Sequence, residues 1–346
     1  NGNNAFSGFY VFVGQGGNGF VLVSADDCAI PILGYSCESQ FSFEGMPDHV
    51  AEWLMGYEIQ IQGLRNLGLP STGEVAELWQ NLLNGPVQTV AFPNAVEPLL
   101  TTTWGQSPYY NDQCPYYDGV NRSVTGCVAT AAAQVMKYWN WPPSGWGTHS
   151  YFGTSGLLSA DFGAETYNWL QMPNLLDSTS SRAQIDAVAK LMYHIGVAVE
   201  MEYADASGAT TSSYDDINTV CLENALKKYF KYKSTLASIY KDDYYDDTWC
   251  LMLKRELDAG RPIIYAGRGS AGGHCFVLDG YDVAGMFHVN WGWSGKANGY
   301  YALTGSDALH LVLQEPDGEP MNDAYIYDQT FFQGLQPSIG TTSPSV

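Results

Sequence analysis

Hydrophobic and polar positions alternate near the start of the chain and then change period. Residues 9–13 and 20–23 carry aromatic and β-branched side chains on either side of a glycine-rich stretch, which predicts a β-hairpin. From residue 50 to residue 64 the apolar positions recur every three or four residues, as they do on one face of a helix. We therefore expect a small α+β unit at the front of the chain.

The segment 84–98, NGPVQTVAFPNAVEP, contains three prolines and has no hydrophobic period. A backbone of this kind lacks strand or helix partners and is open to proteolysis. We place a domain boundary in this segment, with residues 1–90 in the first domain and residues 91–346 in the second.

The second domain begins with helices and continues with strands. Residues 128–139 have high helix propensity, Thr125-Gly126 supplies a cap, and Pro142-Pro143 ends the helix. Helices followed by antiparallel strands predict an α+β fold. Further helices are expected at residues 181–197, 214–230 and 248–259, and strands at residues 262–265, 274–281, 287–291 and 300–303.

The charge balance limits the partners of the protein. The 346 residues include 36 Asp and Glu against 15 Lys and Arg, a net charge of −21, and such a surface repels phosphate backbones, so we expect no nucleic-acid partner. No apolar run approaches the roughly 20 residues that cross a bilayer, so we expect no membrane span. Low charge density and 37 glycines predict an exported protein whose signal peptide is absent from this chain, which begins at Asn1.

The seven cysteines form no C-x-x-C pair, which argues against a zinc ribbon or a thioredoxin-like site. We expect neither a metal nor another cofactor. Because seven is odd, at least one thiol stays free unless it pairs with another chain. Four aspartates at positions 242, 243, 246 and 247 are interpreted as a solvated helix start, with calcium as the weaker alternative.

Cys127 is the candidate nucleophile. It lies in the first turn of an expected helix, where the positive end of the helix dipole lowers the pKa of a thiol. His274 follows it by 147 residues and Asn290 follows in the run HVNWGW, an order typical of a papain-type Cys, His and Asn set. In that scheme His274 moves the proton and the Asn290 carboxamide fixes the tautomer of the imidazole. Trp291 and Trp293 would shield that hydrogen bond from water.

Three long motifs carry a family resemblance. TGCVATAAAQVMKYWNWP, GRPIIYAGRGSAGGHCFVLDGYD and FHVNWGWSGKANGYYAL resemble the active-site blocks of the streptopain family of bacterial papain-like cysteine peptidases. The front of the chain, FYVFVGQGGNGFVLVSADDCAIPILGYS, resembles the propeptide of that family.

The resemblance implies a fold, an activity and a mode of control. The fold would be α+β, a papain-like peptidase with a helical half and an antiparallel β half, preceded by a small α+β prodomain. The protein would be a secreted endopeptidase that hydrolyses protein substrates and removes its own prodomain by cleavage within residues 84–98. Until then the prodomain would act as an intramolecular inhibitor that displaces His274 or blocks the cleft.

One position departs from the family, because Ala266 stands where streptopain has a Gln in the strand before the glycine-rich loop. The oxyanion would then be bound by the main-chain N–H of Cys127 and by the side chain of Gln106, since papain-like enzymes use a Gln upstream of the Cys. Gly272 and Gly273 are expected to form a wall of the substrate cleft, because glycines let the backbone approach a bound peptide.

Two other functions remain open at this stage. A transglutaminase-like acyl transferase would use the same Cys and His chemistry with an amine in place of water. A binding module could keep the fold without catalysis. Cys275 is a weaker candidate nucleophile, because strand alternation turns it away from the face of His274, and His288 is the nearest competing histidine.

Overall fold

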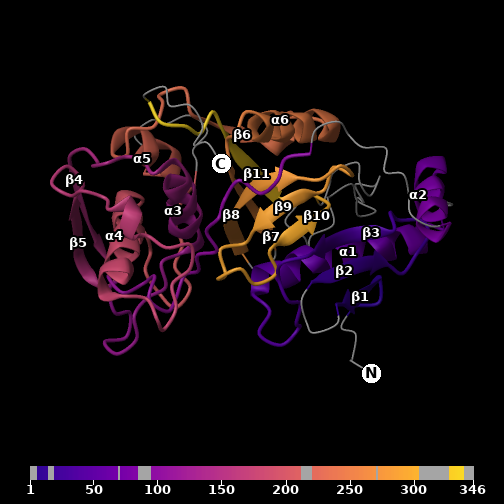
Figure 1. The fold of residues 1–346 in the computed structure, drawn as a ribbon, viewed down its shortest axis with the longest axis horizontal. Coiled ribbons are helices and arrows are strands. Elements are labelled where there is room, and N and C mark those ends of the chain that lie inside the picture. Colours follow the sequence, from indigo (N-terminus) through magenta and orange to yellow (C-terminus); the bar gives the residue numbers. More distant parts are fainter. Residues whose placement is uncertain are drawn as a thin grey trace.

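A computed structural model describes residues 6–14, 19–68, 71–84, 95–211, 220–269, 272–303 and 327–338. The chain forms two lobes, a helical lobe and a lobe built on a large sheet (Figure 1). In the sequence, the helical lobe lies between an N-terminal and a C-terminal segment, and both of these segments contribute strands to the sheet lobe. Among the described residues, no helix is both long enough and apolar enough to cross a membrane.

The sheet lobe holds nine described strands in the order β1-β2-β3-β10-β9-β8-β7-β11-β6, and every neighbouring pair is antiparallel. The strand bounds are β1 (Phe9–Val13), β2 (Phe20–Ser24), β3 (Ile32–Ser36), β6 (Ala237–Tyr240), β7 (Ile263–Gly269), β8 (Gly272–Tyr281), β9 (Phe287–Asn290), β10 (Gly299–Tyr301) and β11 (Tyr327–Gln333).

The N-terminal strands belong to the same sheet as the C-terminal ones. Strand β3 pairs with β10, with Tyr35 opposite Tyr300 and Gly34 opposite Tyr301. The rings of Tyr35 and Tyr300 stack with their centroids 5.1 Å apart. The two regions of the chain therefore share one hydrogen-bonded ladder as well as a hydrophobic interface.

Helices cover both faces of the sheet. On one face, α1 (Asp48–Leu67) and α6 (Asp246–Asp258) pack against the strands in a shared core that contains Trp53, Trp249 and Phe276. On the other face, α3 (Cys127–Trp139) packs against β8 through a separate core that includes Cys275 and Val277. Alternate residues of β8 thus serve opposite faces, as expected for a strand. Helix α2 (Gly73–Leu83) follows α1 at the far end of the sheet lobe (Figure 1).

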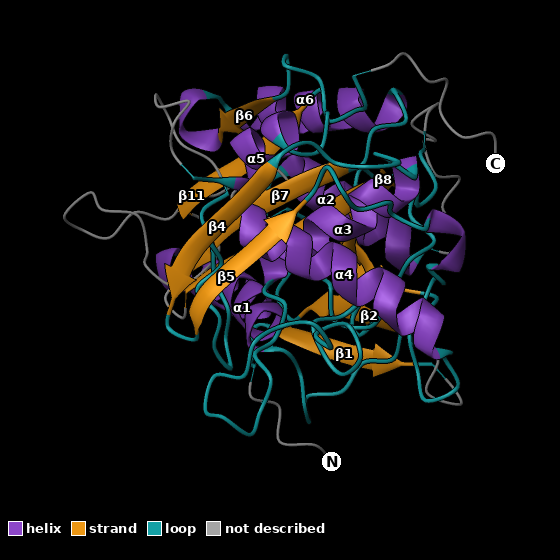
Figure 2. Cartoon of the chain, turned by 90° about the vertical axis from the view of Figure 1, so that its left-hand side faces the viewer, coloured by secondary structure: helices purple, strands orange, loops and turns teal. Residues whose placement is uncertain are grey.

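The helical lobe consists of α3, α4 (Arg182–Ala198), α5 (Leu222–Lys228) and a hairpin of β4 (Thr148–Gly153) and β5 (Gly156–Asp161). Figure 2 shows the hairpin and α4 on the outer side of this lobe. Short 3-10 turns cover residues Trp169–Gln171 and Lys241–Asp243.

The predicted α+β architecture is confirmed, and most of its elements lie within a few residues of their expected bounds. The hairpin of residues 9–13 and 20–23 is β1 and β2, and the helix expected at 50–64 is part of α1. The expected strands at the end of the chain correspond to β7, β8, β9 and β10. Each of these segments has a clear local period, which is why sequence alone located it.

Several expectations differ from the structure. Helix α3 has no side-chain cap, because the Thr125 hydroxyl bonds to the Thr130 hydroxyl and the N-cap residue is Gly126 with φ of 83°. Of the helix expected at 214–230, only α5 forms among the described residues, and 212–219 lie outside them. The sequence analysis missed α2, the β4–β5 hairpin, β3, β6 and β11. The expected boundary near residue 90 falls in 85–94, outside the described residues.

Candidate active site

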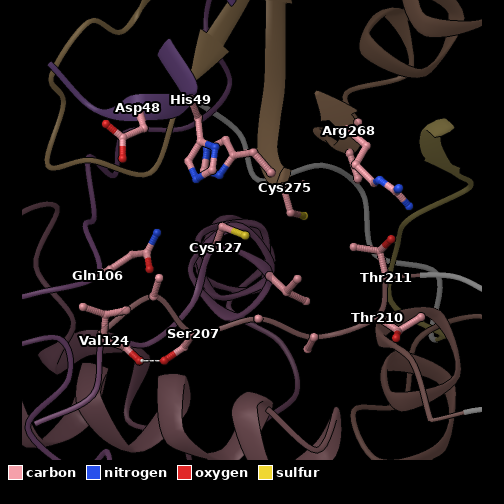
Figure 3. A pocket seen from close by; sticks show the side chains of 18 of the residues that line it. Asp48, His49, Gln106, Val124, Cys127, Ser207, Thr210, Thr211, Arg268 and Cys275 are labelled. Atoms are coloured by element: carbon pink, nitrogen blue, oxygen red, sulfur yellow. Dashed lines mark hydrogen bonds between the residues drawn. The ribbon is translucent and has the colours of Figure 1, made fainter. Parts of the chain in front are cut away.

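A cavity of about 710 Å³ lies where the two lobes meet. Its lining includes the N-terminus of α3, the loop 205–211, the facing ends of β7 and β8, and the first turn of α1. Figure 3 shows Cys127 at the tip of α3, with Gln106 on one side and Thr210 and Thr211 on the other. The cavity therefore gathers residues from four distant parts of the sequence.

Cys127 is the first residue of α3 and lines the cavity. The helix can start here because Gly126 has no side chain, and a Cβ at that position would lie 2.7 Å from the Met201 sulfur. Burial raises the pKa of the Cys127 thiol, although the main-chain N–H groups of Cys275 and Val128 oppose that shift. The expected lowering of this pKa is thus outweighed in the present state, and the sulfur is a neutral thiol.

His274 lies on β8 next to the cavity and is almost fully buried. Its Nε2 is 3.0 Å from the carbonyl oxygen of Trp291. Because a carbonyl only accepts, Nε2 carries the proton and Nδ1 of the neutral ring is left with a lone pair. That Nδ1 is buried and has no hydrogen-bond partner among the described residues. The ring therefore has the tautomer that a general base needs, but its basic nitrogen is not engaged.

His49 of α1 lies directly on the ring of His274. The two ring centroids are 4.2 Å apart and the planes differ by 10°. Burial lowers the pKa of His274 well below its usual value, and the adjacent His49 lowers it further, while the Trp291 carbonyl acts in the opposite direction. Burial also lowers the pKa of His49, against the opposing effect of the Glu52 and Asp48 carboxylates. Both rings are consequently held neutral.

Asn290, at the end of β9, contacts Gln134 and not His274 in the hydrogen bonds of this structure. Its Oδ1 accepts from Gln134 Nε2 at 3.1 Å and from the main-chain N–H of Gly292 at 3.2 Å. Its Nδ2 donates to the carbonyl oxygen of Thr102 at 2.8 Å. The task that the sequence analysis gives to the Asn290 carboxamide, fixing the imidazole tautomer, is performed here by the Trp291 carbonyl.

The rings of both tryptophans lie near the His274 ring, with centroids 6.4 Å away for Trp291 and 6.0 Å away for Trp293. Trp291 is fully buried and its Nε1 donates to the Ala297 carbonyl at 3.1 Å. The Trp293 ring is 6.0 Å from the His274 ring, nearly parallel to it, and also lines the cavity. The hydrogen bond that they were expected to shield, between Asn290 and His274, is replaced here by the one between the Trp291 carbonyl and His274, and their shielding role stays a prediction.

Gln106 and one of the two expected glycines line the cavity. Gln106 is 5% exposed, and its carbonyl accepts from the N–H of Thr125, just before the nucleophile helix. Gly273 lines the cavity, whereas Gly272 begins β8 with φ of 129° and is not among the lining residues. Ala266 also lines the cavity, opposite Cys275 in the strand register. The side chain at position 266 is thus a methyl group facing the site.

His288 is occupied elsewhere. Its Nδ1 is 2.6 Å from Asp279 and its Nε2 is 2.8 Å from Glu38. Cys275 is buried, with its side chain in the core of the helical lobe. No group of three or more metal-ligating side chains is placed to hold an ion within the described part of the chain. None of the seven cysteines forms a disulfide bond.

Two residues of this site were missed by sequence reasoning. Gln134 had a detectable signal, because it is a lone polar residue in the apolar run AAAQVM and lies seven positions after Cys127, on the same helix face. His49 had none, because its contact with His274 joins residues 225 positions apart (274 − 49) and depends on how α1 docks.

Comparison with known proteins defines the class. The fold and the site are those of a papain-like cysteine peptidase that carries an inhibitor-like N-terminal domain. The sequence pattern of the peptidase C10 family matches residues 104–301, more than half of the chain, and that of the Spi protease inhibitor matches residues 1–61. The chain belongs to the peptidase C10 family, the streptopain-like cysteine peptidases.

Individual relatives agree with this assignment. The thiol protease/hemagglutinin PrtT of Porphyromonas gingivalis is 32% identical over 95% of this chain, which spans 37% of that protein. Streptopain of Streptococcus pyogenes is 31% identical over 84% of this chain and 72% of its own length. Among solved structures, a prointerpain A fragment of Prevotella intermedia aligns with a TM-score of 0.73 at 31% identity, covering 94% of this chain and 95% of that one. Active interpain A aligns with a TM-score of 0.58 at 36% identity, covering 72% and 98% respectively.

Proposed function

We propose that this chain is the latent form of a secreted cysteine endopeptidase in which residues 1–90 inhibit residues 91–346. The observation that carries the proposal is the shared cavity of Cys127 and His274, with His49 of α1 stacked on the histidine. PrtT is named as a thiol protease and interpain A as a cysteine protease. The prointerpain A fragment covers 94% of this chain and active interpain A covers 72%, which supports a removable part of the chain.

In the active state the sulfur of Cys127, having lost its proton to Nδ1 of His274, attacks the carbonyl carbon of a substrate peptide bond. The main-chain N–H of Cys127 and the side chain of Gln106 bind the developing oxyanion. The imidazolium then gives its proton to the leaving amine, which breaks the peptide bond and leaves a thioester on Cys127. Finally, neutral His274 removes a proton from water, which hydrolyses the thioester and restores the thiol.

The present state cannot complete the first step. The Cys127 thiol is neutral, and the His49 ring is stacked on the His274 ring at 4.2 Å. Asp48 and His49 also line the cavity where a substrate would enter. Cleavage within residues 84–98, of which 85–94 lie outside the described residues, would release α1 and free the ring.

Self-processing tests this proposal. Wild-type, Cys127→Ala and Cys37→Ala chains are incubated separately, and their fragments are followed by mass spectrometry. We expect the wild-type and Cys37→Ala chains to be cut between the two domains and the Cys127→Ala chain to stay intact. Cys37 is exposed and lies outside the cavity, so it serves as a thiol control. Processing of the Cys127→Ala chain at the wild-type rate would contradict the assignment of the nucleophile.

A competing primary amine separates hydrolysis from acyl transfer. With a peptide substrate and added amine, a peptidase gives mainly the free carboxylic acid, and a transglutaminase-like enzyme gives mainly the amide. We expect the acid as the main product, since the site contains no described feature that selects an amine over water.

A further inference from the structure

The proposed reaction requires the His274 ring to keep one tautomer and one orientation. We propose that Gln134 is a positioning residue which, through Asn290, holds the Trp291 carbonyl against Nε2 of His274. The inference rests on the proposed function and assigns a role to a residue that does not touch the substrate.

Gln134 forms a reciprocal carboxamide pair with Asn290. Its Nε2 donates to Asn290 Oδ1 at 3.1 Å, and its Oε1 accepts from Asn290 Nδ2 at 3.2 Å. Both side chains are buried, at 0% and 2% exposure. A paired amide in such surroundings has no competing water, so each side chain fixes the orientation of the other.

The same Gln134 oxygen also fixes the segment that leads to Gln106. Oε1 accepts from the Thr102 hydroxyl at 3.0 Å and from the main-chain N–H of Trp104 at 3.0 Å. The Gln134 side chain of α3 therefore holds both the end of β9, which carries Asn290, and the segment that precedes Gln106.

Asn290 transmits this constraint to the next peptide unit. Its Oδ1 accepts from the N–H of Gly292 at 3.2 Å, which closes a turn around Trp291. The N–H of Trp291 donates to Asn298 Oδ1 at 3.1 Å, so the peptide is held from both sides. The carbonyl of Trp291 then meets His274 Nε2 at 3.0 Å. The order of contacts is Gln134, Asn290, the Trp291 turn and His274.

This carbonyl matters to the chemistry because it accepts from Nε2 in both the neutral and the protonated ring. A carbonyl aimed at Nε2 keeps the lone pair on Nδ1 and stabilises the imidazolium that forms when Cys127 loses its proton. Misplacing a reacting group by about 1 Å can cost roughly 100-fold in rate. If the Trp291 carbonyl no longer points at Nε2 of His274, the ring can turn, and kcat is expected to fall strongly.

Titratable and charged groups face the His274 site from several elements. Those that line the cavity are Asp48 and His49 of α1, Cys127 of α3, Asp205 of the adjoining loop, Arg268 of β7, Cys275 of β8 and Asp328 of β11. Glu52 of α1 also acts on His49. The groups of α1 leave with the first domain, and the remaining ones are the same in every variant considered below.

The experiment compares Gln134→Met with Val135→Ala in enzyme matured by a trace of wild-type protease, so that the comparison does not depend on self-processing. Gln134→Met keeps the length of the side chain and removes its hydrogen bonds. Val135 is its buried neighbour on α3 and has an apolar side chain that forms no hydrogen bonds, so Val135→Ala is the control for lost helix stability. Gln134→Leu, which removes the same hydrogen bonds and adds no titratable group, is the second variant if Gln134→Met folds poorly.

We expect kcat for a peptide substrate to fall between about 10- and 100-fold in Gln134→Met, with KM within about two-fold of wild type. The alkaline limb of the pH profile, which reports loss of the imidazolium proton, is expected to move to lower pH. Gln134→Leu is expected to change both quantities in the same direction. Val135→Ala is expected to lower the melting temperature and leave kcat and the alkaline limb in place.

The inference is overturned if the Gln134 variants keep kcat within two-fold and an unmoved alkaline limb. It is equally overturned if kcat falls in all three variants in proportion to the loss of thermal stability. Failure of the proposed function looks different, because wild-type enzyme would then cleave no peptide and iodoacetamide would not label Cys127.

Discussion

At the scale of single residues, the contact between His49 and His274 distinguishes the latent state. Two neutral imidazoles lie face to face at 4.2 Å, and the basic Nδ1 of His274 has no hydrogen-bond partner among the described residues. Stacked rings of this kind contribute about 0.5–1.5 kcal/mol beyond their buried area. His49 therefore holds the His274 ring by stacking and not by a hydrogen bond to it.

Replacing His49 by Ala is expected to speed self-processing by about 2- to 10-fold, because the stacking energy that favours the docked state is lost. The measurement is the appearance of the second domain on gels over time at fixed pH and concentration. His49→Phe serves as the matched control, since it preserves a stacked ring. Equal rates for His49→Ala and wild type would show that this contact does not contribute to latency.

The candidate residues of the site could be chosen from the sequence, but the hydrogen bonds between them could not. Cys127 and His274 could be chosen from a helix start and a spacing, which are properties of the sequence itself. The partner of His274 Nε2 could not, because Trp291 and Asn290 are adjacent and only the turn geometry decides which oxygen faces the ring. The direction of the Cys127 pKa also depended on burial by other segments, which no local pattern records.

At the scale of elements, the pairing of β3 with β10 joins the first domain to the second. Periodicity predicted β10 and the β1–β2 hairpin, but it could not predict this pairing, because strand partners far apart in sequence are selected by the folded shape. Gly34 lies in β3 opposite Tyr301, and a Cβ there would lie 2.9 Å from the Tyr300 carbonyl oxygen and 2.9 Å from the Tyr301 ring. The ladder therefore needs a residue without a side chain at this position.

Gly34→Val is expected to weaken docking of the first domain by about 1–3 kcal/mol, since overpacking forces the main chains apart. Placed in the Cys127→Ala chain, which should not process itself, the substitution should lower the midpoint of thermal unfolding. In the chain with Cys127 it should speed self-processing. Gly73→Ala is the control, because a Cβ at Gly73 would meet no atom within 4 Å. An unchanged midpoint in Gly34→Val would contradict the importance of the ladder.

At the scale of the whole molecule, the titrating groups at the contact between the domains change the stability of docking in opposite directions as pH rises. The pKa values of His49 and His274 are lowered in the docked state, so their contribution to docking is present above about pH 6.5 and declines as pH falls below it. Although burial opposes charge on His288, Asp279 and Glu38 raise its pKa to about 10. Its contribution is complete below pH 6.5 and is lost as pH rises toward 10.

Docking is therefore expected to be strongest near neutral pH and to weaken on acidification from pH 7.5 to 5.5. Over that interval Glu38 stays ionised, because its hydrogen bond to His288 lowers its pKa, so the imidazoles of His49 and His274 determine the change. Thermal unfolding of the Cys127→Ala chain across this range measures the effect. His49→Phe in the same background should reduce the dependence, and a midpoint that rises on acidification would refute the assignment.

Strand β10 contains only three residues, Gly299–Tyr301, and its outer neighbour in the latent chain is β3. Once the first domain departs, the mature enzyme is left with a bare sheet edge at β10. Long bare edges recruit other chains and promote fibrils, whereas very short ones offer too few donors and acceptors to template a growing assembly. If the first domain is released as proposed, the brevity of β10 leaves an exposed edge that is too short to promote aggregation.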